Sequence, residues 1–340
     1  MEADLVKRAG VPFRAIPAAG VHGVGLRALP GNLWRLARGY LAAGRLLKEF
    51  CPQVLLFTGG YVAVPVALAA RLNFRAKDRP RSLVFVPDIE PGLALKTLVR
   101  FADQVAVTNE KSRNYLKSRP AVKVSGYPVR SDLKSMSKET GRATLQLQAD
   151  LPTLLVLGGS KGARSINRAL VMVLPQLLSE MQVIHITGQL DWEEMDKARQ
   201  RLSADQAGRY RVSPYLYEEM GAALAAADLV VSRAGASILG EYPLFGLPAV
   251  LVPYPYAWRY QRTNAAYLAE RGAAVLLPDD ELPRRMLPVI REVMQDKKRL
   301  LSMAQAMSVL AQPKAAETIA EILCGLALKT AREGNSTWSA

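Results

Sequence analysis

The chain has 340 residues, half of them hydrophobic, a length that suits two domains of ordinary size, and it contains no apolar run long enough to span a bilayer. Its two cysteines, Cys51 and Cys324, and its two histidines, His22 and His185, form no metal-binding spacing. We therefore expect neither a metal nor a cofactor and favour a reducing cytoplasm as the compartment. The net charge is +15, and residues 1–134 carry +13 of it, with 22 Lys and Arg against 9 Asp and Glu.

Short β-branched runs alternate with helical segments along the first half, a pattern typical of parallel α/β layers. The polar stretch 134–150 has no apolar periodicity until its end, and we interpret it as a linker between a first domain at 1–134 and a second at 150–330. In the first half we expect strands at 54–57, 82–86, 104–108 and 123–125, and helices at 64–72 and 93–101.

The same alternation resumes after the linker. We expect strands at 153–157, 182–187, 210–212, 229–231, 249–252 and 274–277, and helices at 165–178, 192–202, 218–226, 238–245, 283–295, 298–308 and 315–330. Two α/β halves in tandem predict an α/β fold of two Rossmann-like domains that face a cleft, where the ligands of such sheets usually bind.

The basic residues of the first half predict an anionic partner. Arg35, Arg38, Arg45 and Lys48 lie among apolar helical positions, and few aromatic residues stand at the spacing that suits base stacking. An anionic membrane surface is therefore favoured over nucleic acid, which we do not expect as a partner. An ordinary solvated basic face remains the alternative.

Two strand-to-helix turns in the second half carry the clearest chemical signal. After Leu157 the turn Gly158-Gly159-Ser160-Lys161-Gly162 leads into a helix, so backbone N–H groups and the helix dipole face one point that suits a phosphate. A tight turn without a ligand has the same pattern. The second turn, Arg233-Ala234-Gly235-Ala236-Ser237, precedes a helix that carries Glu241. That carboxylate either caps its helix electrostatically or accepts hydrogen bonds from ribose or sugar hydroxyls.

A pair of amides forms the third signal. Gln261 and Asn264 are three residues apart and are expected on one face of a helix. Such a pair suits sugar hydroxyls, but ordinary surface amides have the same spacing.

These motifs occur in the same order and spacing in the MurG family, the peptidoglycan N-acetylglucosaminyltransferases with the GT-B fold, and the chain resembles that family from residue 1 to the linker and from 152 to about 328. In the first half the resemblance rests on Gly59-Gly60-Tyr61-Val62 with Pro65, Pro91-Gly92-Leu93, Arg100-Phe101-Ala102-Asp103 and Gly126-Tyr127-Pro128-Val129-Arg130. It implies an inverting transferase that moves N-acetylglucosamine from UDP-N-acetylglucosamine to a lipid-linked N-acetylmuramoyl-pentapeptide. It also implies a peripheral position on the cytoplasmic face of the cell membrane.

The resemblance implies roles for individual residues. Ser160 and its turn match the diphosphate cradle, and Arg233 matches an arginine near the donor phosphates. Gln261, with Asn264 nearby, matches the group that reads the N-acetylglucosamine. The positions that match the uridine and ribose site are Arg130, Leu216, Ala236, Ser237, Ile238, Leu239, Gly240 and Glu241. The acceptor-side positions are Gly59, Gly60, Tyr61 and Asp88.

Two departures from the family pattern affect the acceptor half. Family members begin with a strand and a Gly-Thr-Gly-Gly-His loop that supplies the proposed general base, whereas the segment from Met1 to Val6 resembles an internal family segment. No catalytic base is therefore assigned among the residues present. The family's His-Glu-Gln-Asn stretch reads here Phe85-Val86-Pro87-Asp88, which keeps a polar side chain only at the last position.

Four functions follow as expectations, and the fourth and weakest, a nucleic-acid binder, rests on charge alone. The first is the transferase that the resemblance implies. The second, motivated by the altered stretch at 85–88, is a transferase of the same fold with another lipid or glycan acceptor. The third is a sugar-nucleotide-binding protein without turnover.

Overall fold

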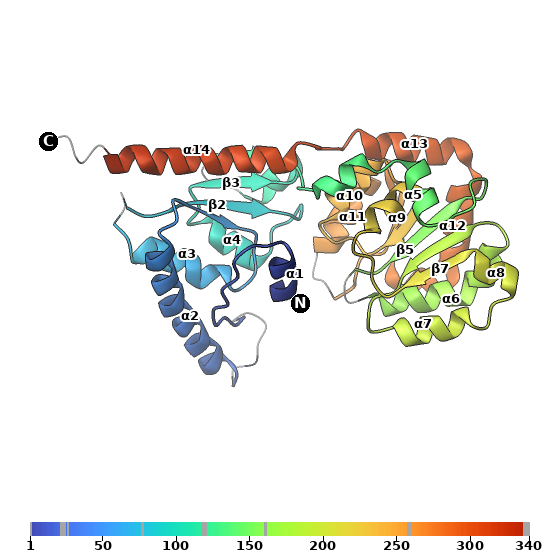
Figure 1. Ribbon diagram of the computed structural model, residues 1–340, viewed down its shortest axis with the longest axis horizontal. Helices are drawn as coiled ribbons and strands as arrows, with labels where there is room; N and C mark the ends of the chain where they lie inside the picture. Colours follow the sequence, from blue (N-terminus) through green and yellow to red (C-terminus); the bar gives the residue numbers. More distant parts are fainter. Residues whose placement is uncertain are drawn as a thin grey trace.

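The computed structural model describes residues 2–20, 25, 27–75, 78–116, 121–159, 162–256 and 260–335. Figure 1 shows two α/β bodies side by side, with the last helix running back across the first of them. Each body has one parallel sheet, as the alternating pattern predicts. No helix within these ranges combines the length and the apolarity that a bilayer crossing needs.

The first sheet has four parallel strands in the order β1-β2-β3-β4. Its central strand β2 is buried along almost its whole length, which explains the continuous apolar run in its sequence. The strands are β1 (Val54–Phe57), β2 (Arg81–Val86), β3 (Gln104–Val107) and β4 (Val122–Val124), and the helices that follow or flank them are α1 (Glu2–Arg8), α2 (Leu29–Phe50), α3 (Ala63–Leu72), α4 (Leu93–Val99), η1 (Glu110–Tyr115) and η2 (Ser131–Ser135).

Different helices cover the two faces of this sheet. One face packs against α3 and α4 through a core that includes Phe57, Val84 and Leu98. The other face packs Leu83 and Phe85 against the apolar stripe of α14 (Ala315–Asn335), which carries Ile319, Ile322 and Leu326.

The position of α14 corrects the predicted division of the chain. The sequence assigned residues 315–330 to the second domain, but this helix packs on strands β1 and β2 of the first. Its 3.6-residue periodicity fixes which face is apolar and cannot fix which sheet covers that face. The chain therefore crosses between the two bodies twice.

The second sheet has six parallel strands in the order β10-β9-β8-β5-β6-β7. Counted along the chain from its first strand, this is the 3-2-1-4-5-6 order of the Rossmann fold, and the order reverses between β5 and β8. The strands are β5 (Thr153–Leu157), β6 (Gln182–Ile186), β7 (Tyr210–Ser213), β8 (Leu229–Ser232), β9 (Ala249–Leu251) and β10 (Ala274–Leu276).

Two apolar cores sandwich this sheet. One joins the sheet to α6 and α12, with Leu170 and Ile290 among the fully buried residues, and the other joins it to α9, α10 and α11, with Ala223 and Leu268. The helices are α6 (Arg164–Leu178), α7 (Trp192–Arg199), α8 (Ala204–Gly208), α9 (Met220–Ala226), α10 (Ile238–Phe245), α11 (Tyr260–Ala269), η3 (Asp279–Glu281), α12 (Leu282–Gln295) and α13 (Lys297–Ser308).

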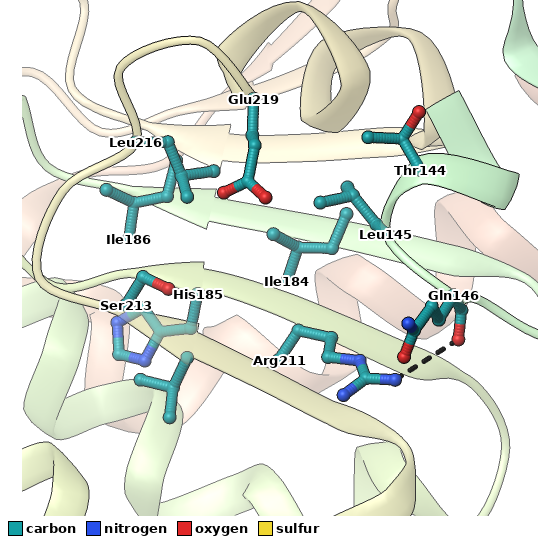
Figure 2. Close-up of a pocket in the computed structure, with 11 residues that line it drawn as sticks. Thr144, Leu145, Gln146, Ile184, His185, Ile186, Arg211, Ser213, Leu216 and Glu219 are labelled. Atoms are coloured by element: carbon teal, nitrogen blue, oxygen red, sulfur yellow. Dashed lines mark hydrogen bonds between the residues drawn. The ribbon is translucent and has the colours of Figure 1, made fainter. Parts of the chain in front are cut away.

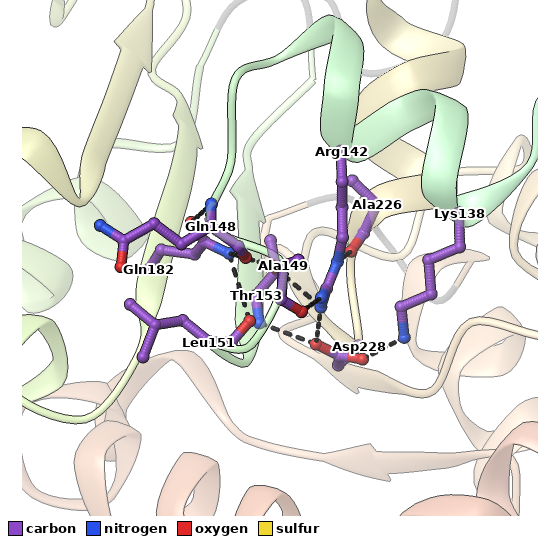
Figure 3. Close-up of polar contacts among 9 residues, drawn as sticks. All are labelled: Lys138, Arg142, Gln148, Ala149, Leu151, Thr153, Gln182, Ala226 and Asp228. Carbon is purple, nitrogen blue, oxygen red and sulfur yellow. Dashed lines mark hydrogen bonds and ion pairs between the residues drawn. The ribbon is translucent and has the colours of Figure 1, made fainter.

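The stretch predicted as a linker contains a helix, α5 (Lys138–Thr144), that docks on α9 of the second body. Figure 3 shows the polar network that fixes it. Asp228 accepts hydrogen bonds from Lys138, from Nη2 of Arg142 at 3.0 Å and from the backbone N–H of Thr153 at 2.7 Å. Because Gly141 has no Cβ, α5 approaches α9 closely; a Cβ there would lie 2.6 Å from the carbonyl oxygen of Ala222.

Candidate functional site

The site lies where the order of the second sheet reverses. The turns that follow β5 and β8 both lie at the carboxyl-terminal ends of the strands. Open parallel sheets bind ligands at such a point. Gly159 and Gly162 adopt φ values of +82° and +79°, which only glycine adopts easily, and a Cβ at Gly158 would lie 2.3 Å from the backbone nitrogen of Ala163. The glycines are therefore required by the backbone path into α6. Ser160, the predicted phosphate ligand, lies outside the described residues.

A cavity of about 900 Å³ opens beside this turn. It brings together three features that the sequence singled out separately, namely the glycine turn at 158–162, Arg233 and Gln261. It is also lined by Ala163, Arg164, Ser165, Arg168, Leu190, Asp191, Tyr254, Pro255, Tyr256 and Asp279.

Arg233 is a fixed cation in the wall of this cavity. Its side chain is 10% exposed, and its Nη1 donates to Asp279 at 2.5 Å and to the carbonyl oxygen of Val252 at 3.2 Å. Nη2 donates to Oγ of Ser165 at 2.7 Å, and the guanidinium carbon lies 5.1 Å from the centre of the Tyr254 ring. The carboxylate offsets the cost of burying the arginine, so the charge is held in place before any ligand binds.

Gln261 lies at the first turn of α11 and is held by the opposite loop. Its Oε1 accepts a hydrogen bond from the backbone N–H of Tyr254 at 2.8 Å. That bond fixes the orientation of the side-chain amide, whose NH₂ group is then the part of Gln261 left to donate toward the cavity that it lines.

Glu241 lies on α10 in a mostly buried position near Ser237 and Arg130. Burial raises the pKa of the Glu241 carboxyl, while a hydrogen bond with Ser237 and the charge of Arg130 act in the opposite direction. Arg130 comes from the first domain and donates to the carbonyl oxygen of Tyr217 at 3.3 Å, so it spans the junction between the domains. The predicted uridine and ribose residues Arg130, Ser237 and Glu241 are thus neighbours.

The other residues of the predicted uridine segment serve the packing of α10. Ile238 and Leu239 are buried in the core, where their side chains pack beneath α10. Gly240 faces the first domain, where an added Cβ would lie 2.9 Å from Tyr127 and from Val129. Ala236 is half-buried in the turn that precedes α10.

Leu216, after β7, is buried and lines a second cavity of about 380 Å³ between β6, β7 and the end of α5. Figure 2 shows Ile184 and Ile186 forming an apolar wall of this cavity with Glu219 beside it. Tyr215 and Tyr217 on either side of Leu216 pack ring on ring, with centroids 4.4 Å apart. This cavity adjoins the predicted uridine position through Leu216.

Asn264 joins the two domains and is fully buried. Its Oδ1 accepts from the backbone N–H of Ile89 at 3.0 Å, and its Nδ2 donates to Asp88 at 2.8 Å and to the carbonyl oxygen of Ala234 at 3.1 Å. The oxygen and both N–H groups of this amide are thus engaged within the protein. Asn264, predicted to lie near the sugar, also connects the first domain to the turn after β8.

The acceptor-side residues occupy loops at the carboxyl ends of β1 and β2. Gly59 and Gly60 adopt φ values of +114° and +80°, and Tyr61 is 49% exposed. Phe85 and Val86, which replace polar residues of the family pattern, lie in the interior of the first domain. Their side chains pack on opposite faces of the sheet. Apolar residues therefore fit there without altering the surface of the cleft.

His185 lies in the interior of the second domain, beneath the second cavity. It is fully buried on β6, where its ring nitrogens meet the hydroxyl of Tyr210 at 2.7 Å and Oδ1 of Asn167 at 3.0 Å. Burial lowers the pKa of His185 to about 3, so the ring stays neutral. Its hydrogen bonds support the sheet, whereas His22 lies outside the described residues.

Sequence reasoning missed several residues of the main cavity. Asp279, the partner of Arg233, follows β10 at the same sheet edge as the other turns, and a carboxylate directly after a buried strand was a signal for it. Arg164 and Ser165 begin the helix that follows the glycine turn, a position from which side chains reach a ligand at that turn.

Two family models match the chain. The glycosyltransferase family 28 N-terminal domain matches residues 1–107, and the glycosyltransferase family 28 C-terminal domain matches residues 153–319. Relatives of the chain are named UDP-N-acetylglucosamine–N-acetylmuramyl-(pentapeptide) pyrophosphoryl-undecaprenol N-acetylglucosamine transferase. The one from Desulforamulus reducens is 39% identical over 326 residues, covering 94% of this chain and 86% of that protein. The one from Roseiflexus is 41% identical over 367 residues, covering 97% of this chain and 82% of that protein.

Solved structures agree with this assignment. The crystal structure of MurG from Acinetobacter baumannii is 28% identical, with a TM-score of 0.70, and the match covers 96% of this chain and 88% of that one. A UDP-GlcNAc 2-epimerase from Neisseria meningitidis, bound to UDP-GlcNAc, shares the fold alone, with 13% identity and a TM-score of 0.66 over 95% of this chain and 88% of that one. The two Rossmann-like domains form the GT-B fold, and the chain belongs to the MurG family within glycosyltransferase family 28.

Proposed function

We propose that this protein transfers N-acetylglucosamine from UDP-N-acetylglucosamine to lipid-linked N-acetylmuramoyl-pentapeptide, with inversion at the anomeric carbon. The observation that carries the proposal is the cavity of about 900 Å³ in which the glycine turn, Arg233 and Gln261 meet. The names of the relatives support the same donor and acceptor.

The donor is proposed to lie along the carboxyl edge of the second sheet. Its uridine lies near Leu216 and Arg130, and its ribose hydroxyls donate to Glu241. The diphosphate lies at the glycine turn and the start of α6, where backbone N–H groups and the helix dipole favour an anion. The sugar reaches Gln261, whose orientation the backbone of Tyr254 fixes.

The reaction follows from this arrangement. The 4-hydroxyl of the acceptor sugar attacks the anomeric carbon, the new glycosidic bond forms, and the bond to the diphosphate oxygen breaks with its electron pair going to UDP. Arg233 stabilises the negative charge that develops on the leaving UDP. Because Asp279 and Ser165 hold the guanidinium in place, little reorganisation is needed at that step.

A direct assay tests this function. The purified chain is incubated with UDP-N-acetylglucosamine and the lipid-linked muramoyl-pentapeptide, and both UDP release and the disaccharide-lipid product are measured. Formation of both supports the proposal. Calorimetric binding of the donor without product from this acceptor contradicts it and favours a binding protein or a different acceptor.

We also propose that the first domain docks on the anionic cytoplasmic face of the membrane that holds the acceptor. The helix α2 supports this. Trp34, Arg38, Leu41, Arg45 and Lys48 are exposed and recur every three or four residues, so they form one stripe along the helix. Apolar residues that alternate with cations suit an interface between lipid headgroups and acyl chains.

Vesicle binding tests this docking. Co-sedimentation with vesicles of anionic lipid is expected to exceed that with neutral lipid and to weaken as salt is raised, because salt screens the attraction. Equal binding to both vesicle types contradicts a role for the basic stripe. A competition with duplex DNA separates this preference from general affinity for polyanions.

A further inference from the structure

We propose that Asp88 accepts the proton of the attacking acceptor hydroxyl, an inference that rests on the transfer reaction proposed above. Asp88 follows β2 at the edge of the first domain that faces the second. The neighbouring strand β1 is parallel to β2, so both strands end on the same side of the domain. The residues that follow β1 there are Gly59, Gly60 and Tyr61. The carboxylate therefore belongs to the acceptor side and lies directly against the donor domain.

Asn264 fixes the orientation of this carboxylate. Its Nδ2 donates to Oδ1 of Asp88 at 2.8 Å and also to the carbonyl oxygen of Ala234 at 3.1 Å. Ala234 opens the turn that leads to Ser237 and Glu241, so one amide holds the carboxylate at a set position relative to the donor turn. A base whose direction is set by a third group is the arrangement that general-base catalysis uses.

The carboxylate keeps capacity for the acceptor. An ionised carboxylate accepts about four hydrogen bonds, and Asn264 uses one of them. The Asp88 side chain is half-buried rather than fully enclosed, unlike Asn264.

Other ionisable groups around Asp88 in the described part of the chain are less suited to the role. Glu90 is 5% exposed and faces Lys96 at 3.6 Å. Glu241 belongs to the donor side, where Ser237 and Arg130 face it. Burial, with smaller contributions from the charges of Glu241 and Asp88, raises the pKa of Tyr127 to about 12.

The pKa of the Tyr260 hydroxyl is raised as well. Desolvation is the main cause, with further contributions from Glu90, Asp88 and Tyr61. Phenols that stay protonated at neutral pH cannot accept the proton.

The surroundings of Asp88 also suit its strength as a base. Burial raises the pKa of the Asp88 carboxyl above its ordinary value, and the hydrogen bond from Asn264 partly opposes that rise. A carboxylate whose pKa lies closer to the working pH is a better proton acceptor. In the step itself the hydroxyl oxygen bonds to the anomeric carbon, its proton moves to a carboxylate oxygen of Asp88, and UDP leaves with the electron pair.

The test compares the wild type with Asp88→Asn. Asparagine has the same shape and keeps an oxygen that accepts from Asn264, so the contact between the domains is retained, but the amide cannot take a proton. We expect kcat to fall about 10²- to 10⁴-fold, with calorimetric affinity for UDP-N-acetylglucosamine unchanged and a thermal unfolding midpoint no lower than that of the wild type. We expect kcat of the wild type to rise with pH through an acid limb, and we expect the variant to lose that limb.

Two further variants keep the result interpretable. Asp88→Glu is expected to restore part of kcat together with the acid limb, which a purely structural role would not do. Glu110→Gln removes an exposed carboxylate of the same domain that pairs with Arg113, and its pH profile is expected to match the wild type. A kcat for Asp88→Asn within threefold of the wild type, or a retained acid limb, overturns the role of Asp88 alone. Absence of product from the wild type overturns the transfer reaction and the base together.

Discussion

The two domains present their functional residues in different ways. In the second domain the site consists of backbone turns and of side chains whose positions are fixed by hydrogen bonds within the protein. Arg233, for example, donates to Asp279 and to Ser165. In the first domain the most prominent feature is the stripe on α2, where Trp34 and its cationic neighbours are exposed to solvent. Binding of a small charged ligand is favoured by polar groups whose positions are fixed before the ligand binds. Binding to a lipid surface is favoured by a large exposed apolar area next to positive charges.

The difference also appears in how each sheet is covered. Two apolar cores of its own helices sandwich the second sheet, while one face of the first sheet is covered by α14 from the far end of the chain. The junction at Asn264 adds a second tie between the domains. The core of the second domain is therefore formed mostly by segments that are close in sequence, whereas the first domain depends on contacts with a helix from the far end of the chain.

The largest effect is expected at the fixed cation. Arg233→Ala removes the cation that we propose stabilises the leaving UDP, and it leaves Asp279 without its cationic partner. We expect kcat to fall about 10²- to 10³-fold and the free energy of unfolding to fall by about 3 kcal/mol. Steady-state kinetics and urea unfolding measure the two effects.

Arg285→Ala is the matched control, since Arg285 forms an exposed pair with Glu281. Its expected cost in unfolding free energy is below about 1 kcal/mol. Equal costs for the two arginine variants would show that the site does not hold Arg233 in place.

A smaller effect on activity but a clear loss of stability is expected at the junction. Asn264→Ala leaves the N–H of Ile89, the carboxylate of Asp88 and the carbonyl of Ala234 without a partner, and we expect the unfolding free energy to fall by about 3 kcal/mol. Gln261→Ala, one turn away, is expected to cost less than about 1 kcal/mol in stability and to weaken donor binding instead. Similar profiles for the two variants would remove the distinction between a junction residue and a ligand-reading residue.

Glu241 is expected to trade stability for affinity. Glu241→Gln should weaken UDP-N-acetylglucosamine binding by roughly 10- to 100-fold, because a hydrogen bond to a charged group is lost, as calorimetry would measure. The folded-state pKa of Glu241 is raised, so its contribution to stability is present below the unfolded pKa and is lost as pH rises through the folded value.

The variant should therefore be more stable than the wild type at pH 7, and the gap between them should close toward pH 4. Thermal unfolding at the two pH values measures this difference. A variant less stable than the wild type at pH 7 would mean that burial does not dominate at Glu241.

The smallest effect is expected on the surface of the first domain. Trp34→Ser removes the largest apolar side chain of the α2 stripe and should lower partitioning onto anionic vesicles by roughly three- to tenfold. Donor affinity should stay unchanged. Leu301→Ser, an equally exposed apolar position in the second domain, serves as the control and should leave vesicle binding as it is. Equal losses in the two variants would argue against a membrane face on α2.

Much of the fold could be predicted from local pattern. Each strand begins and ends within one residue of its predicted position, because a strand buried on both faces is a short apolar run between turn residues. The glycine turn was predicted for the same reason, since its backbone angles exclude other residues. The helix α5 was missed because its contact with α9 rests on Gly141 and on ion pairs to Asp228, which leave no apolar period in the sequence.

The sequence by itself determined that there are two α/β domains, that glycine turns follow particular strands, and that positive charge gathers in the first domain. Only the tertiary structure decided that α14 covers the first sheet, that Asp279 holds Arg233, and that Asn264 donates to Asp88. The physical reason is that local sequence fixes backbone angles and the apolar face of an element. The partner of a buried polar group depends on which strands become neighbours, and that is set by packing across the whole chain.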